Sequence, residues 1–145
     1  MRLNSAKDLE VYRKAYDLAM KIFNLTRSFP AEEKFALTGQ IRRSSRSVCL
    51  NLREAWSKRR YEAHFVSKLT DCDGENSETD SSLDFAKDCN YIAVDQHAAA
   101  AVVGDDQLAA LVADDGVAVL DAGVLQLERR LAAAPDDHRR LREDA

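Results

Sequence analysis

The chain has 145 residues, of which 46% are apolar, 32% are charged and 7% are aromatic. This is the length of one ordinary domain, and the apolar content suffices for a helix-bundle core, which leaves no room for a second folded domain. With only two prolines and five glycines, the chain lacks the turn residues that an all-β fold requires, so long helices are favoured.

The two halves of the chain carry opposite net charges. Up to Thr70 there are 15 Lys and Arg residues against 7 Asp and Glu, whereas from Asp71 onward 6 stand against 18. A basic half of this kind predicts an anionic partner.

The cysteines and the apolar segments bear on the compartment. The three cysteines have no C-x-x-C spacing, which predicts small buried side chains in a reducing compartment rather than disulfides or a zinc site. No segment has the pattern of a signal peptide or the length of a membrane span. We therefore expect a cytoplasmic protein with no membrane partner.

The first predicted helix spans residues 9–28, with Asp8 as its N-cap and Pro30 as its stop. Its core row has helical spacing and contains Val11, Ala15, Leu18, Ile22, Leu25 and Phe29. A second apolar row contains Tyr12, Tyr16, Ala19 and Phe23. Because two rows exceed what one neighbour can cover, Tyr12, Tyr16 and Phe23 are candidate subunit contacts.

The second predicted helix spans residues 38–57, with Thr38 as a cap, and its core row contains Leu37, Ile41, Val48, Leu52 and Ala55. At 100° per residue, Arg42, Arg46 and Arg53 fall within about 40° of one another, away from that row. Arg43 extends the same side, and the turn that follows adds Lys58, Arg59 and Arg60. All of these cations are candidate nucleic-acid-binding residues.

The third predicted helix spans residues 61–89, with Asn90 as a C-cap. Its core row contains Phe65, Leu69, Cys72, Asn76, Thr79, Leu83 and Ala86. The opposite side carries a row of small residues at steps of three and four, namely Ser67, Thr70, Gly74, Ser77 and Ser81. Small side chains let another backbone approach closely, so this row is also a candidate subunit contact.

After Ile92 the composition changes to runs of Ala, Asp and Val, with glycines at 104, 116 and 123. The simplest prediction is an atypical fourth helix over residues 96–133, stopped by Pro135. Residues 1–133 then form a single domain, and residues 134–145 form a disordered tail.

The acidic stretch of residues 70–80 resembles a calcium loop at first sight. Placing Gly74 at the sixth loop position puts Leu69, which cannot ligate calcium, at the first, so an acidic helix surface explains the stretch better. The three histidines lie far apart, and no H-x-x-x-H, E-x-x-H or G-x-S-x-G spacing occurs. We expect no catalytic residues, no metal, no cofactor and no enzymatic activity.

The cation cluster has two interpretations. Arginine side chains on one helix face suit the phosphates of a nucleic-acid backbone. The same arginines suit pairing with the acidic second half, inside one subunit or between subunits. Tyr12, Tyr16, Phe23 and Trp56 offer stacking surfaces for bases, although their helical spacing favours packing.

Four segments, in one order within residues 6–92, resemble a known family. They are DLEVYRKAYDLAMKIFNLT followed by FP, ALTGQIRRSSRSVCLNLREAW, KRRYEAHFVSKLTD and LDFAKDCNYI. The family consists of bacterial four-helix-bundle proteins named for the 23S rRNA intervening sequences that encode some of them. The resemblance implies an antiparallel up-and-down bundle that forms a ring-like homo-oligomer, often a pentamer, and it supplies no catalytic residues.

A more distant resemblance is to the accessory protein of diversity-generating retroelements, a pentameric barrel whose basic surface binds nucleic acid and a reverse transcriptase. Arg42 and Arg43 match the basic second-helix segment of the family, and Arg46 continues that surface. The sequence departs from the family after Ile92, where an amphipathic helix rich in Glu, Leu, Ile and Lys is usual. One hypothesis is a shift of reading frame there, and translating the other two frames of the gene tests it.

These patterns together predict an all-α, antiparallel up-and-down four-helix bundle with an atypical fourth helix. We expect a non-enzymatic homo-oligomer, with a pentamer favoured, that binds RNA or another nucleic acid through its second helix, in connection with ribosomal RNA. The alternative is a protein-interaction scaffold whose arginines serve subunit contacts.

Overall fold

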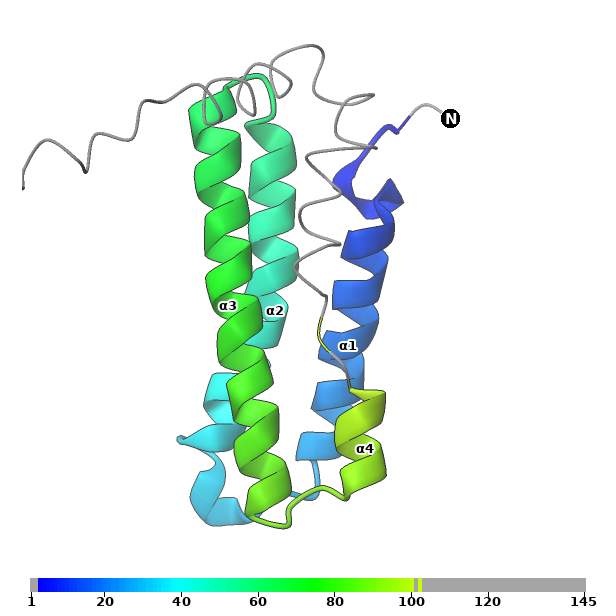
Figure 1. The fold of residues 1–145 in the computed structure, drawn as a ribbon, viewed down its shortest axis with the longest axis vertical. Coiled ribbons are helices and arrows are strands. Elements are labelled where there is room, and N and C mark those ends of the chain that lie inside the picture. Colours follow the sequence, from blue (N-terminus) through cyan, green and yellow to red (C-terminus); the bar gives the residue numbers. More distant parts are fainter. Residues whose placement is uncertain (1–2, 101, 103–145) are drawn as a thin grey trace, which may run out of the picture.

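The computed structural model describes residues 3–100 and 102, which form an all-α bundle (Figure 1). Its elements are η1 (Ala6–Asp8), α1 (Glu10–Thr26), η2 (Ala31–Glu33), α2 (Leu37–Ser57), α3 (Glu62–Asp88) and α4 (Val94–Ala99). In Figure 1, α1 runs down, α2 up and α3 down, so successive long helices are antiparallel. The predicted fold class is confirmed, and the first three predicted helices agree with α1, α2 and α3 to within two residues at each end.

Helix α1 begins differently from the prediction. Asp8 belongs to η1, where its carboxylate accepts the backbone N–H of Ser5 at 3.0 Å and the Ser5 hydroxyl accepts the backbone N–H of Lys7 at 3.3 Å. The cap position of α1 is Leu9, which is buried and makes no side-chain capping bond. The predicted Asp8 cap is therefore wrong, because this carboxylate is already engaged by the preceding turn.

The start of α2 also differs from the prediction. Thr38 lies inside the helix, and its hydroxyl oxygen is buried without a hydrogen-bond partner in the described part of the chain. Glu33 does the capping instead, since its Oε2 accepts the backbone N–H of Leu37 at 3.1 Å. The predicted Thr38 cap is wrong because an acid four residues before Leu37 reaches the free N–H groups at the helix start.

Helix α3 contains the whole acidic stretch of residues 70–80, which confirms the helix over the calcium loop. Every residue of the predicted core row is buried, namely Phe65, Leu69, Cys72, Asn76, Thr79, Leu83 and Ala86. The middle of this row is occupied by the small or polar residues Cys72, Asn76 and Thr79. Helices whose facing residues are small can approach each other closely, so α2 packs tightly along α3.

At the C-terminal end of α3 the C-cap is Cys89, and the predicted Asn90 lies one position beyond it, where it terminates the helix. Asn90 has a left-handed backbone with φ of 60°, which asparagine tolerates better than most residues. The N–H of Asn90 donates to the carbonyl of Lys87, and the N–H of Tyr91 donates to the carbonyl of Ala86, both at 2.9 Å. This is the bonding pattern of a Schellman motif, which turns the chain towards α4.

Two connections meet at this end of the bundle. The Tyr91 hydroxyl, just after α3, donates to Oε1 of Glu33 at 3.0 Å, while the other oxygen of Glu33 caps α2. The Tyr91 ring also lies 5.3 Å from the ring of Phe29. The hydrogen bond to Glu33 raises the pKa of the Tyr91 phenol. One carboxylate thus joins the α1–α2 connection to the α3–α4 connection.

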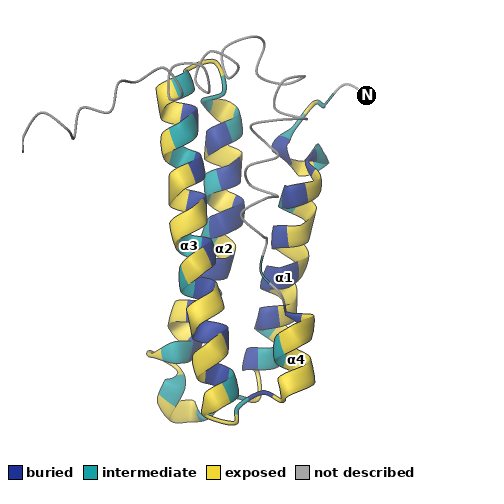
Figure 2. Cartoon of the chain, viewed as in Figure 1, coloured by how far each residue is buried: buried dark blue, intermediate teal, exposed yellow. Residues whose placement is uncertain are grey.

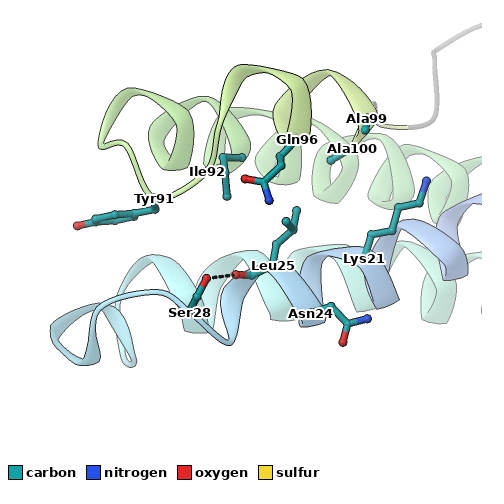
Figure 3. A pocket seen from close by; sticks show the side chains of 9 residues that line it. All are labelled: Lys21, Asn24, Leu25, Ser28, Tyr91, Ile92, Gln96, Ala99 and Ala100. Atoms are coloured by element: carbon teal, nitrogen blue, oxygen red, sulfur yellow. Dashed lines mark hydrogen bonds between the residues drawn. The ribbon is translucent and has the colours of Figure 1, made fainter.

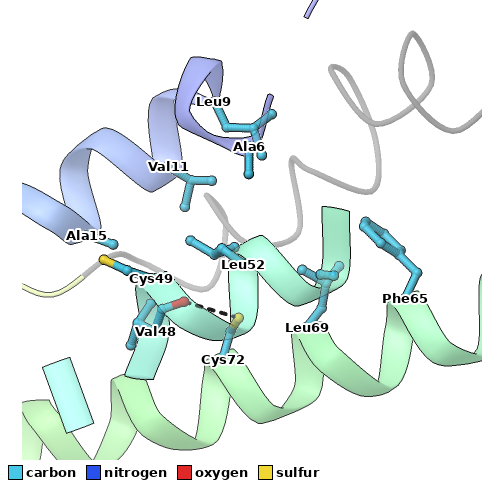
Figure 4. Close-up of a cluster of buried hydrophobic side chains, with 11 residues drawn as sticks. Ala6, Leu9, Val11, Ala15, Val48, Cys49, Leu52, Phe65, Leu69 and Cys72 are labelled. Carbon is cyan, nitrogen blue, oxygen red and sulfur yellow. Dashed lines mark hydrogen bonds between the residues drawn. The ribbon is translucent and has the colours of Figure 1, made fainter. Parts of the chain in front are cut away.

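The core consists of two clusters on the inner faces of the long helices (Figure 2). The first joins α1, α2 and α3 near the N-terminal end of α1 and includes Val11, Val48, Leu52, Leu69 and Cys72 (Figure 4). The second joins the other ends of these helices to the start of the fourth element and includes Leu18, Ile22, Ile41, Leu83 and Ile92. Burial of large aliphatic side chains of this kind contributes about 1.5–3 kcal/mol each.

The fourth element is described only at its start. Helix α4 begins at Val94, two residues before the predicted start at 96, and within the described residues it ends at Ala99. The rest of the predicted helix 96–133, the tail 134–145 and the reading-frame hypothesis lie outside the described residues, as does the predicted end of the domain at 133. Across the described part of the chain, no helix combines the length and apolarity needed to cross a membrane.

The burial of the cysteines predicts their reactivity. Burial raises the pKa of the Cys49 thiol to about 11 and that of the Cys72 thiol to about 12, whereas Cys89 is exposed. Because the thiolate is the reactive form, we expect iodoacetamide at pH 8 to label Cys89 alone in the native protein and all three cysteines in denaturant. Mass spectrometry of the labelled protein counts the adducts. Rapid native labelling of Cys72 would contradict the packing.

A buried pair of hydroxyls predicts an energetic coupling between α2 and α3. The hydroxyl oxygens of Ser44 and Thr79 lie 2.8 Å apart, and both side chains are almost fully buried. We expect Thr79→Val to lower the free energy of unfolding by about 1–3 kcal/mol. We also expect Ser44→Ala to lower this free energy less in the Thr79→Val background than in the wild-type protein. Urea denaturation measures both, with the exposed Ser77→Ala as the matched control. Strictly additive costs would show that the pair contributes nothing.

Candidate nucleic-acid interface

The predicted cations of α2 divide between two sides of the helix. Arg42 lies on the side of α1, because its Nε donates to the Thr26 hydroxyl at 2.7 Å and its guanidinium lies 5.0 Å from the centre of the Phe23 ring. At 100° per residue, Arg46 and Arg53 lie within about 40° of Arg42. We call these three residues the arginine ridge. The ridge therefore follows the outer edge of the contact between α1 and α2.

Arg43 lies on the other side, against α3. Its guanidinium forms ion pairs with Glu75 at 3.2 Å and with Glu78 at 2.6 Å. The hydrogen bond to Glu78, together with the charge of Glu75, raises the pKa of the Arg43 guanidinium. The interpretation in which arginines pair with the acidic half inside one subunit is thus correct for Arg43, whose charge is engaged within the bundle.

Arg46 and Arg53 differ from Arg43 in their surroundings. Both are exposed, and the guanidinium of neither forms an ion pair or hydrogen bond with any residue in the described ranges. Leu50, which lies between them on the helix surface, is 62% exposed. Each of the two guanidinium groups therefore keeps all its N–H donors available to an external partner.

The cations of the α2–α3 turn have mixed environments. Arg59 donates to the backbone carbonyl of Trp56 at 2.8 Å, and its guanidinium lies 4.6 Å from the centre of the Trp56 ring. Lys58 is half-buried and Arg60 is exposed. The structure thus holds the Arg59 guanidinium over an aromatic ring, beyond the last turn of the arginine ridge.

The predicted aromatic residues of α1 lie beside the arginine ridge. We call Tyr12, Tyr16 and Phe23 the aromatic row. Phe23 contacts Arg42, and helical spacing puts Tyr12 and Tyr16 on the same side of α1 as Phe23. The Tyr12 and Tyr16 rings are stacked, with centres 6.3 Å apart and planes inclined by 23°. Two sets of residues that the sequence assigned to different roles thus meet on one surface.

The register of α1 and α2 fixes which residues are level with each other. The helices are antiparallel, Phe23 contacts Arg42, and Ala15 packs in one cluster with Val48 and Cys49. Tyr16 lies about two turns before Phe23, so it is level with a point about two turns after Arg42. Tyr16 is therefore placed opposite the stretch between Arg46 and Arg53.

Ion pairs of both polarities join α2 to α3 on the side away from the arginine ridge. Lys68 of α3 bridges Glu54 of α2 at 2.7 Å and Asp71 at 3.3 Å, and the bond to Lys68 lowers the pKa of the Glu54 carboxyl. Together with the pairs of Arg43, these bridges join α2 to α3 along their shared edge. The acidic helix thus meets the basic helix on the side away from the arginine ridge.

The predicted row of small residues on α3 is exposed along its length, at Ser67, Thr70, Gly74, Ser77 and Ser81. A Cβ atom added to Gly74 would meet no heavy atom within 4 Å. Within the described part of one chain, nothing packs against this row, so its predicted role as a subunit contact stays a prediction.

A pocket that the sequence did not reveal lies between α1 and α4, with a volume of about 410 Å³ (Figure 3). Lys21 and Leu25 line it from α1 and Ser28 from the segment just after that helix, and Ile92 and Gln96 line it from the other side. No sequence motif marks it, because its shape depends on where α4 lies against α1. The described residues contain no group of three or more His, Cys, Asp or Glu side chains that could hold a metal ion.

Comparisons with known proteins agree with the geometry. A family model described as 23S rRNA-intervening sequence protein matches residues 7–102. A crystal structure from Bacteroides thetaiotaomicron, described as a protein with unknown function from the S23 ribosomal protein family, is similar with a TM-score of 0.55 and 28% sequence identity. That match covers 70% of this chain and 87% of the other. The search of curated proteins finds no match.

Proposed function

The chain belongs to the family of 23S rRNA-intervening sequence proteins, and from that premise we propose that it is a non-enzymatic, homo-oligomeric bundle that binds RNA through its arginine ridge. We connect the RNA with the ribosome because the family name refers to ribosomal RNA. We also propose the cytoplasm as its compartment, since the described cysteines are all free thiols, as in a reducing environment.

The observation that carries this proposal is the difference between arginines of one helix. Arg43 is engaged by two glutamates, whereas the guanidinium groups of Arg46 and Arg53 are exposed and make no bond to the described residues. A guanidinium with no partner inside the bundle keeps its full positive charge at the surface. Arg46 and Arg53 are therefore the cations of this helix that are available to an external anion. Guanidinium groups bind phosphate oxygens through two parallel N–H bonds, which suits a nucleic-acid backbone.

Phosphate binding of this kind has a physical signature. Each cation that neutralises a phosphate releases a condensed counterion, so affinity falls as the salt concentration rises. Phosphate binding by itself does not depend on base sequence, because the phosphates are the same at every position of a nucleic acid. The arginine ridge therefore predicts salt-sensitive binding with little dependence on base sequence.

A second candidate function is a protein-interaction scaffold, and the exposed small-residue row of α3 favours it. The row contains no charged residue, although acids such as Asp73 and Asp80 flank it. A second copy could place its arginine ridge against those acids, which would repeat around a closed ring. In this alternative the arginines serve subunit contacts, and a pentamer is the assembly that the family resemblance favours.

A salt titration separates the two functions. We expect wild-type protein to bind RNA in a filter assay with a steep dependence on salt, and Arg46→Ala with Arg53→Ala to lower that slope by about two. Arg43→Ala is the matched control, since it removes one arginine of the same helix whose charge is already engaged; its slope should stay unchanged. Loss of the oligomer in the double variant, with weak and unchanged RNA binding, would establish the scaffold instead.

The oligomer has its own test at Gly74. A Cβ added there meets no heavy atom of the described residues within 4 Å, and a leucine removes a helix penalty of about 1 kcal/mol, so the isolated bundle should be no less stable. If the small-residue row is a subunit contact, Gly74→Leu should shift native mass spectra towards monomer, whereas Ala98→Leu on the exposed face of α4 should not. An intact oligomer in the Gly74→Leu variant would rule out this contact.

A further inference from the structure

We infer that the ligand of the arginine ridge is an unpaired RNA strand, whose bases stack on the aromatic row while its phosphates meet the arginines. This inference rests on the proposed function, and it adds the class of nucleic acid and a role for the aromatic side chains. It follows from the meeting of the two residue sets along one edge of the α1–α2 contact.

The exposure of Tyr16 is the first step. Its side chain is 52% exposed, although Tyr12 and Phe23 of the same row are half-buried. An aromatic ring left in water forfeits the burial that normally stabilises it, and exposed aromatic side chains are enriched where a partner binds. The Tyr16 ring lies nearly parallel to the Tyr12 ring, with ring centres 6.3 Å apart. The stack of two rings offers its outer surface to a third planar group.

The charges around Tyr16 identify that planar group. Tyr16 lies opposite the stretch between Arg46 and Arg53, two arginines without a partner among the described residues. A ligand that covers the ring and also meets these arginines must therefore carry negative charge beside its planar part. A nucleotide has this combination, a flat base joined to a phosphate, and proteins bind single strands by pairing a basic track with aromatic surfaces.

Both ends of this surface already hold stacked cations. At one end the Arg42 guanidinium lies over Phe23, and at the other the Arg59 guanidinium lies over Trp56. These contacts fix the two arginines in place before any ligand arrives, so less side-chain entropy is lost on binding. Bases can continue the same stacking between the two ends.

The dimensions fit a short strand. From Arg42 to Arg53 the ridge extends about 16 Å at ~1.5 Å per residue. With roughly 3.4 Å between successive nucleotides of a stacked strand, this length corresponds to about five nucleotides.

A duplex fits the same surface less well. In a double helix the bases are stacked on one another and enclosed by the backbones, so a ring on a helix surface cannot reach a base face. A duplex would then use the arginines alone and leave Tyr16 in water. The aromatic row therefore distinguishes an unpaired strand from a duplex.

Fluorescence anisotropy with three labelled probes tests the inference: an unstructured 12-nucleotide RNA, the same RNA annealed to its complement, and the single-stranded DNA of the same sequence. We expect Tyr16→Ala to weaken binding of the single-stranded RNA at least about fivefold and to leave the duplex unaffected. Tyr16→Phe keeps the ring and should bind as wild type. Phe85→Ala is the matched control, because Phe85 is 65% exposed on the outer side of α3.

The chain offers a second readout in its single tryptophan. Trp56 is half-buried at the end of the proposed track, so a bound strand should change its fluorescence, and this change should disappear in Arg46→Ala with Arg53→Ala. Native mass spectra of each variant, recorded at the same protein concentration, confirm that the assembly is intact.

The possible failures are distinguishable. If Tyr16→Ala binds the single strand as wild type, or if the duplex binds more tightly, the inference is wrong, and the proposed function stands as long as Arg46→Ala still weakens binding. If no probe shows salt-dependent binding, both the inference and the proposed function are wrong.

If Tyr16→Ala dissociates the oligomer, the aromatic row is a subunit contact and the inference is overturned. Weaker binding of the DNA strand supports RNA, and equal or tighter binding overturns the choice of RNA over DNA.

Discussion

The close packing of α2 against α3 is the constraint on which the rest of the bundle depends. The face of α3 that meets α2 has Cys72, Asn76 and Thr79 at its centre, and Ser44 meets Thr79 from the other side. Groups this small let the helix axes approach and leave no freedom for α2 to rotate without losing a buried hydroxyl contact. Because this contact fixes the rotation of α2 about its own axis, it also fixes the direction in which every other side chain of α2 points.

The rotation of α2 decides what each of its arginines does. Arg42 and Arg43 are neighbours in the sequence, yet about 100° separates them on the helix. Arg43 therefore meets the acids of α3, and Arg42 meets Phe23 and Thr26 of α1. The acidic helix neutralises one edge of the basic helix and cannot reach the other. The same packing that stabilises the bundle thus leaves the arginine ridge beside the aromatic row.

Helical periodicity predicted the elements well, because three long helices repeat buried residues at steps of three and four. The rows of α1 and α3 could be read directly, even where Asn76 and Thr79 take core positions. The caps at Asp8 and Thr38 could not, although the interactions that replace them are local: Asp8 closes a turn with Ser5, and Glu33 lies four residues before Leu37. Each helix start offers several candidate caps within one turn, and only the backbone geometry decides which of them is used. Helix α4 begins at Val94, two residues before the predicted start.

The candidate site was harder to predict than the fold. The sequence contains both the cations and the aromatic residues, but only the packing shows on which edge of α1 the rings lie. Arg43 was grouped with the other cations because a helical wheel gives directions without neighbours. Its partners Glu75 and Glu78 are more than thirty positions away in the chain, so no local pattern could connect them.

Glu33 has a consequence for how the bundle opens. Its carboxylate holds the start of α2 and the Tyr91 hydroxyl, which are contacts within one turn and across 58 positions of the chain. Bringing such distant segments together costs loop-closure entropy, and local contacts do not offset this cost. We therefore expect the bond between Glu33 and Tyr91 to form late in folding. Both connections at this end then share one opening equilibrium, and backbone amides of residues 33–37 and 89–92 should exchange with solvent as a single cooperative unit, separate from the middle of the helices.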